Sequence, residues 1–208
     1  MKKDWLAPLT GVAFVALVII GFSVAGEPPD AKSSPEEIVN FYVSNTDSVR
    51  IGALLSAAAG LLFIFFANHL RRVFDAAGEA PLSVTVLVGG SVMAVGAAID
   101  ATILLAIAET ADDIEATSVQ TLQALWDNDF LPIALGLLVF LISAGLSILR
   151  TGALPRWLGW VALALAVIGF TPIGFAAFLG AGIWIVVVSV MLAVRAGRSS
   201  GSTPAASA

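Results

Sequence analysis

The chain has 208 residues, of which 59% are hydrophobic and 12% are charged, and its formal net charge is −5. Its mean hydropathy of +0.98 corresponds to more apolar surface than a soluble fold of this length could bury, so we expect an integral membrane protein. The acidic balance argues against nucleic acid as a partner. The lack of cysteine and the single histidine exclude disulfides, thiolate nucleophiles and His-rich metal clusters.

Six apolar stretches approach or exceed the roughly 20 residues that a bilayer-spanning helix needs. They cover residues 6–25, 51–69, 82–106, 130–149, 157–174 and 178–194. Each stretch is expected to be helical, because backbone polar groups in hydrocarbon must bond to one another. The predicted fold class is therefore all-α, a polytopic bundle of six transmembrane helices. Residues 1–195 are expected to form this one membrane domain, and residues 196–208 a disordered cytoplasmic tail.

The charged residues predict the orientation of the bundle. Of the 25 Lys, Arg, Asp and Glu residues, 24 lie outside the apolar stretches. The N-terminus, residues 71–81, residues 150–156 and the tail together hold eight basic and three acidic residues, whereas the loops 26–50 and 109–129 hold two basic and eleven acidic residues. Because cytoplasmic loops are enriched in Lys and Arg, both termini are predicted to be cytoplasmic.

The first stretch follows Lys2 and Lys3 and so resembles a signal peptide. Its apolar run is longer than a usual signal sequence has, and we expect it to be retained as a helix.

The outward loop 26–50 contains Ser34-Pro35-Glu36-Glu37, which has the spacing of a capped helix start. A short helix is predicted over about residues 35–44, and its apolar stripe of Ile38, Phe41 and Tyr42 is interpreted as an interfacial brace or, alternatively, a lid. The second outward loop, 109–129, is acidic without calcium-loop spacing, which favours a solvated acidic face.

Residues 157–194 hold no charge, and the turn between the last two spans is predicted from Pro172, Gly174, Gly180 and Gly182. Helix contacts are predicted where small residues let backbones approach. The second and third spans supply the residues for these contacts: Gly52, Ser56, Gly60, Gly89, Gly90 and Gly96.

Asp100 is the one charged residue inside a predicted span. It shares a helix face with Gly96, Met93 and Gly89, which favours a carboxyl that faces other helices. Counted from Leu82, it lies about 27 Å along a core of roughly 30 Å, close to the outer boundary. It is either a carboxyl that reaches outer water or a neighbouring hydroxyl, the interpretation we favour, or a proton- or cation-coupling site.

Two further observations bear on function. His69, Arg71 and Arg72 lie at the end of the second span, where cations interact favourably with the C-terminal end of a helix. A pH-sensing role for His69 is the alternative.

No metalloprotease, nucleophile-elbow, P-loop or dinucleotide-binding motif is present, and no second intramembrane aspartate completes a dyad. We therefore expect neither an enzyme nor a cofactor.

Three segments together resemble a broad family of small, six-span bacterial membrane proteins, common in actinobacteria, that is classed as a domain of unknown function. They are Ser34-Pro35-Glu36-Glu37-Ile38 with Phe41-Tyr42, His69-Leu70-Arg71-Arg72, and Leu154-Pro155-Arg156-Trp157-Leu158-Gly159-Trp160. The resemblance implies six helices in a bacterial inner membrane and assigns no activity or catalytic residue.

We therefore expect a non-enzymatic, structural or accessory protein of the bacterial inner membrane that binds a lipid or a partner protein, with a second copy of the chain as another partner. The alternative is a small transporter or ion-coupled permease that uses Asp100.

Overall fold

The computed structural model describes residues 6–171 and 174–200, and these residues form helices and connecting loops without any β-strand. A 3₁₀ turn over Ala7–Leu9 leads into α1 (Thr10–Ala25). The longer helices that follow are α2 (Pro35–Ala76), α3 (Ala80–Thr110), α5 (Leu131–Thr151) and α7 (Gly174–Ser200). Two shorter helices complete the chain, α4 (Ala116–Trp126) and α6 (Arg156–Gly169).

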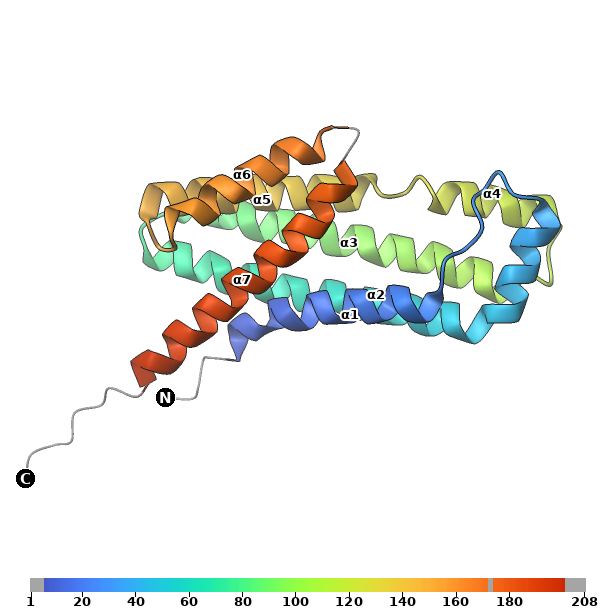
Figure 1. The fold of residues 1–208 in the computed structure, drawn as a ribbon, viewed down its shortest axis with the longest axis horizontal. Helices are drawn as coiled ribbons and strands as arrows, with labels where there is room; N and C mark the ends of the chain where they lie inside the picture. The colour runs from blue at the N-terminus through green and yellow to red at the C-terminus, as the bar shows by residue number, and fades with distance from the viewer. Residues whose placement is uncertain (1–5, 172–173, 201–208) are drawn as a thin grey trace, which may run out of the picture.

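The helices form a closed ring of contacts. Helix α1 packs on α2, α2 on α3, α3 on α5, α5 on α6 and α6 on α7, and α7 returns to α1. Figure 1 shows α1, α2, α3 and α5 side by side along the long axis, with α4 beyond the start of α5 and α7 crossing the bundle at an angle. The chain is therefore an apolar helical bundle, as expected of an integral membrane protein.

Within the described ranges, five helical segments are long and apolar enough to cross a membrane. The segment predicted as the fifth span, 157–174, corresponds mainly to the 14-residue α6, which measures about 21 Å against a hydrocarbon core of roughly 30 Å.

The residues predicted to form the turn before the last span occupy different positions in the structure. Gly174 begins α7, whereas Gly180 and Gly182 lie inside this helix, so their placement in the turn is wrong, and Pro172 lies outside the described residues.

Helix α2 has 42 residues and extends well beyond a single membrane span. Its first turn is capped, because the Ser34 hydroxyl accepts a hydrogen bond of 3.2 Å from the Glu37 N–H. The first helical segment runs from Pro35 to a bend at Asn45, whose φ of −122° and ψ of 17° are not helical, so it ends close to the predicted position near residue 44. Helical conformation then resumes and continues to Ala76, so the residues between this segment and the predicted second span are helical rather than a loop. The polar residues from Thr46 to Arg50 include neither proline nor glycine, which allows the helix to resume there.

Two predicted boundaries at the other end of the molecule also change. Because α2 continues to Ala76, its last turn holds no basic residue, and the predicted role of His69, Arg71 and Arg72 at the helix terminus is wrong. Helix α7 extends to Ser200, so residues 196–200 are helical rather than disordered. Arg195 anchors this extension by donating a 2.6 Å hydrogen bond to the Ala153 carbonyl, and residues 201–208 lie outside the described residues.

The interior divides into two hydrophobic clusters. The first, here called the central core, is built around Phe14, Phe63, Phe66, Phe140 and Trp184, with ring centroids 4.7 Å apart for Phe14 and Phe63 and 4.9 Å for Phe63 and Phe140. The second, here called the α4-end core, packs the start of α2 and the end of α3 against α4. Its buried members are Ile38, Tyr42, Val49, Ala53, Ala101, Leu104, Ile107, Ala108, Ala111 and Val119.

Candidate functional site

A small cavity lies where the end of α1 meets α2, α3 and the last residue of α4. Its volume of about 20 Å³ is enough for roughly one water molecule. Helix α1 ends at this cavity because Gly26 adopts a φ of 75°, a left-handed value that favours glycine. The lining residues are Gly21, Phe22, Ala25, Gly26, Pro28, Val49, Gly52, Ser56, Asp100, Leu104 and Trp126.

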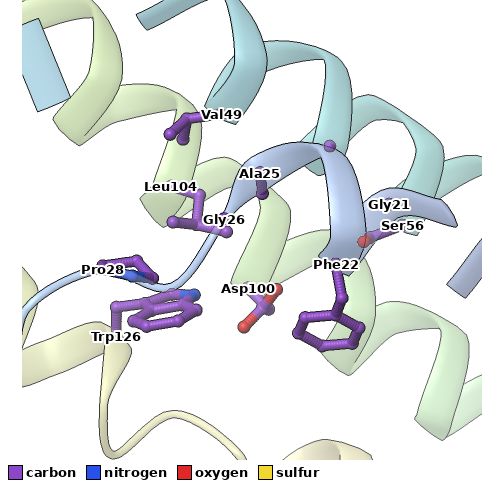
Figure 2. A pocket seen from close by; sticks show the side chains of 11 residues that line it. Gly21, Phe22, Ala25, Gly26, Pro28, Val49, Ser56, Asp100, Leu104 and Trp126 are labelled. Carbon is purple, nitrogen blue, oxygen red and sulfur yellow. The ribbon is translucent and has the colours of Figure 1, made fainter. Parts of the chain in front are cut away.

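Asp100 is the only charged residue that lines the cavity. Figure 2 shows its carboxylate between the rings of Trp126 and Phe22. The side chain is half-buried. The residues predicted to share its face of α3, namely Gly89, Met93 and Gly96, are all buried. The carboxyl therefore faces a cavity between helices at the level where α1 ends.

Trp126 was not singled out from the sequence, because it lies in the segment 109–129 that was interpreted only as a solvated acidic loop. Its indole N–H interacts with the Asp100 carboxylate, although it does not reach the geometry of a hydrogen bond with any described group. Phe22 was missed as well, as it is one of many apolar residues in the first span. Neither residue carries a sequence signal that links it to Asp100.

The electrostatic environment of Asp100 is negative. Asp129 lies close enough for its charge to act on Asp100, and the Asp129 Oδ2 atom is buried with no hydrogen-bond partner in the described structure. Among the residues that the structure describes, no Lys, Arg or His forms an ion pair with either carboxylate. Arg50, which is in the same part of the bundle, instead pairs with Asp47 and Glu109, each at 3.5 Å.

A series of hydrogen bonds in the α4-end core holds the carboxylate of Asp127 in place. The buried Tyr42 hydroxyl donates to Oε1 of Gln123, and Nε2 of Gln123 donates to Asp127 at 2.9 Å. The other carboxylate oxygen of Asp127 accepts a 3.0 Å hydrogen bond from the Ala31 N–H. Asp127 therefore has partners on both oxygens, in contrast to Asp129.

Helix α4 also holds the loop that follows α1. The Gln120 amide donates to the carbonyls of Ala31 and Ser33, at 2.9 and 3.0 Å. Of the predicted stripe, Ile38 and Tyr42 are completely buried and Phe41 is partly buried, all in the cluster with α3 and α4. The stripe therefore packs on these two helices, and whether it also acts as an interfacial brace or a lid stays a prediction.

The glycines predicted at helix contacts lie against other helices of the same chain. A Cβ added at Gly52 would lie 2.6 Å from the Ala25 Cβ, and one at Gly89 would lie 2.5 Å from the backbone N of Phe140. Gly60 and Gly90 mediate the contact of α2 with α3 through Ala94 and Ala67, Gly96 faces Ile133 of α5, and Ser56 faces Gly21 of α1. These approaches pack the bundle that holds the cavity.

The polar groups at the opposite end of the bundle form a separate cluster. Arg71 pairs with Asp75 at 3.3 Å, and Asp75 also accepts a hydrogen bond from Ser83. The largely buried Glu79 pairs with Arg150 at 3.6 Å. These pairs link Asp75 and Ser83 across the α2–α3 turn and tie Glu79 of that turn to the end of α5.

No group of three His, Cys, Asp or Glu side chains in the described ranges could hold an ion. The arrangement around Asp100 can instead accept hydrogen bonds and attract positive charge.

Comparisons with known proteins identify a family but no characterised relative. No curated protein and no solved structure matches the chain. A model of a domain of unknown function, DUF4386, matches residues 9–200, in agreement with the resemblance seen in the sequence. The chain belongs to this family of membrane proteins of unknown function.

Proposed function

We propose that the chain is a non-enzymatic, accessory protein of a bacterial inner membrane that binds a lipid-like ligand at the cavity around Asp100. The observation that carries this proposal is the cavity itself, which combines a carboxylate with apolar walls. Its edge continues into lipid-exposed surface, because Phe22 is 62% exposed and neighbouring Ile19 is 60% exposed. Ligand sites commonly combine apolar walls with a few polar groups in this way.

We propose that six helices cross the membrane, with both termini cytoplasmic and the α4 end outside. Two features support this topology. The start of α1 and the end of α7 lie toward the same end of the bundle (Figure 1), as an even number of crossings requires. The loops at that end carry most of the Lys and Arg residues. Helix α6 would then cross together with the residues that follow it.

A photoactivatable lipid tests the proposed function directly. Protein in nanodiscs would be labelled with a phospholipid that carries a diazirine near its headgroup, and the labelled peptides would be identified by mass spectrometry. We expect labelling of residues 21–28, at the end of α1. The variant Ser56→Leu places a larger side chain in the cavity wall and should reduce this labelling several-fold. Ser91→Leu, a serine of α3 that does not line the cavity, is the matched control and should leave labelling unchanged.

A transporter is the second candidate, and the half-buried carboxylate inside a cavity is the observation that favours it. It predicts solute or proton flux in liposomes that contain only this protein, and loss of that flux in Asp100→Asn with normal expression. The accessory role predicts no such flux. Robust flux in wild-type liposomes would overturn it in favour of the transporter.

A further inference from the structure

Asp100 in the cavity and Asp129 nearby have no positively charged partner in the described structure. Asp127 is occupied by Gln123 and Ala31, whereas Asp100 and Asp129 have no ion-pair partner among the described residues. A buried carboxylate oxygen that accepts no hydrogen bond, such as Asp129 Oδ2, costs free energy that a donor would recover. These two carboxylates therefore favour a cation or a hydrogen-bond donor as ligand.

The size of the cavity limits the group that can enter. A volume of about 20 Å³ holds one water-sized group. A primary ammonium is close to this size and offers three N–H donors. A trimethylammonium group is several times larger and would have to displace the walls.

The walls add a second preference for positive charge. The rings of Trp126 and Phe22 flank the Asp100 carboxylate (Figure 2). Aromatic rings attract cations within about 6 Å of the ring centroid. A neutral hydroxyl would satisfy a carboxylate oxygen but would gain little from the rings or from the charge of Asp129.

The surroundings favour a ligand with an apolar chain. Phe22, which lines the cavity, is 62% exposed, and Ile19, one turn earlier on α1, is 60% exposed. A chain attached to the ammonium could lie along such a surface within the bilayer, as the exposed helix faces themselves do. A small soluble amine would leave this surface unused.

We infer that the ligand of the Asp100 cavity is an amphiphile with a primary ammonium headgroup, bound by the Asp100 carboxylate between the rings of Trp126 and Phe22, with the nearby charge of Asp129 adding to the attraction. This inference rests on the proposed binding function and specifies its ligand class.

The test compares amphiphiles that share one chain. Radiolabelled dodecylamine, dodecyltrimethylammonium and dodecanol would be titrated into wild-type protein in phosphatidylcholine nanodiscs, with protein-free nanodiscs subtracted. Dodecylamine should bind at least about tenfold more tightly than the other two, a ratio that corresponds to one charge-assisted hydrogen bond. Methylammonium, added as an unlabelled competitor, should not displace it.

Two variants locate the binding. Asp100→Asn and Asp129→Asn should each weaken dodecylamine binding about tenfold. Asp113→Asn removes the same charge from an exposed position that does not line the cavity and should leave binding unchanged. Circular dichroism and gel filtration of each variant confirm that it is folded. Because two different carboxylates are tested, misfolding of one variant leaves the other decisive.

The remaining outcomes separate this inference from the proposed function. Equal binding of dodecanol and dodecylamine, unaffected by Asp100→Asn and Asp129→Asn, would overturn the ammonium inference and leave lipid-like binding intact. Displacement of dodecylamine by methylammonium at similar concentration would overturn the requirement for an apolar chain. Failure of all three amphiphiles to bind, together with no lipid labelling of residues 21–28, would overturn the proposed function as well.

Discussion

The central core and the α4-end core are both apolar, yet different contacts hold them together. The central core joins helices mainly through aromatic rings and glycine contacts, and its Trp184 indole donates a 2.9 Å hydrogen bond to the Leu158 carbonyl. The α4-end core contains a hydrogen-bonded series from Tyr42 through Gln123 to Asp127.

We attribute this difference to the solvent that the proposed topology places around each region. Lipid chains give no hydrophobic drive for helices to associate, so close packing must supply the attraction in the central core. Helix α3 is about 46 Å long, which exceeds a hydrocarbon core of roughly 30 Å, and its excess length is shared with α4 and the start of α2. At that end, burial from water and hydrogen bonds can stabilise the structure as they do in soluble proteins.

Gly89→Ala tests the role of close packing and should have the largest effect. The added methyl group would meet the backbone of Phe140 rather than a flexible side chain, so α3 and α5 must separate. We expect a loss of about 3 kcal/mol in the free energy of unfolding, near the upper end for overpacked cores. The measurement is denaturation of the protein in mixed micelles with increasing dodecyl sulfate, followed by circular dichroism.

Gly182→Ala is the matched control for this prediction. It lies in α7, where the nearest atom to an added Cβ is 4.0 Å away, and alanine favours the helix by about 0.5 to 1 kcal/mol. Stability should therefore stay the same or rise. Equal losses in the two variants would mean that close approach of α3 and α5 does not hold the central core together.

The sequence predicted the apolar parts of this fold well because they depend on local signals. The capped start at Ser34 and the apolar segments of α1, α3 and α5 were recognised from residues adjacent in the chain. The return to helical conformation after the bend at Asn45, over Thr46–Arg50, was missed. A helix does not have to end where it leaves the membrane, and hydropathy reports only the change of solvent.

The candidate site was predictable only in part, for a different reason. Asp100 is conspicuous as one charge in a long apolar stretch, and its expected direction toward other helices agrees with its place at a cavity. Trp126, Phe22 and Asp129 belong to other segments, and only tertiary packing brings them to Asp100. The ends of α2 and α7 were misplaced because polar terminal turns were interpreted as loops.

Tyr42→Phe tests the hydrogen-bonded α4-end core and should have an intermediate effect. The substitution keeps the ring and removes the donor to Gln123, leaving a completely buried amide oxygen without that partner. We expect a loss of about 1 to 2 kcal/mol, the usual cost of an unsatisfied buried group. The same denaturation experiment measures it. Thr121→Val removes an exposed hydroxyl from α4 and should change stability by less than about 0.5 kcal/mol; similar losses in both variants would argue against a special role for Tyr42.

Arg50→Gln should have the smallest effect and shows whether water reaches this end of the protein. Arg50 is 43% exposed and pairs with Asp47 and with Glu109 of α3. Exposed pairs contribute about 0 to 1 kcal/mol and are screened by salt. The difference between wild type and Arg50→Gln, measured by urea denaturation at low salt, should therefore shrink as sodium chloride rises. Arg72→Gln is the control, since Arg72 forms no ion pair with described residues. A difference that persists at high salt would place Arg50 in a dry environment, and the boundary between the two solvents would then lie beyond Arg50 rather than at the end of α1.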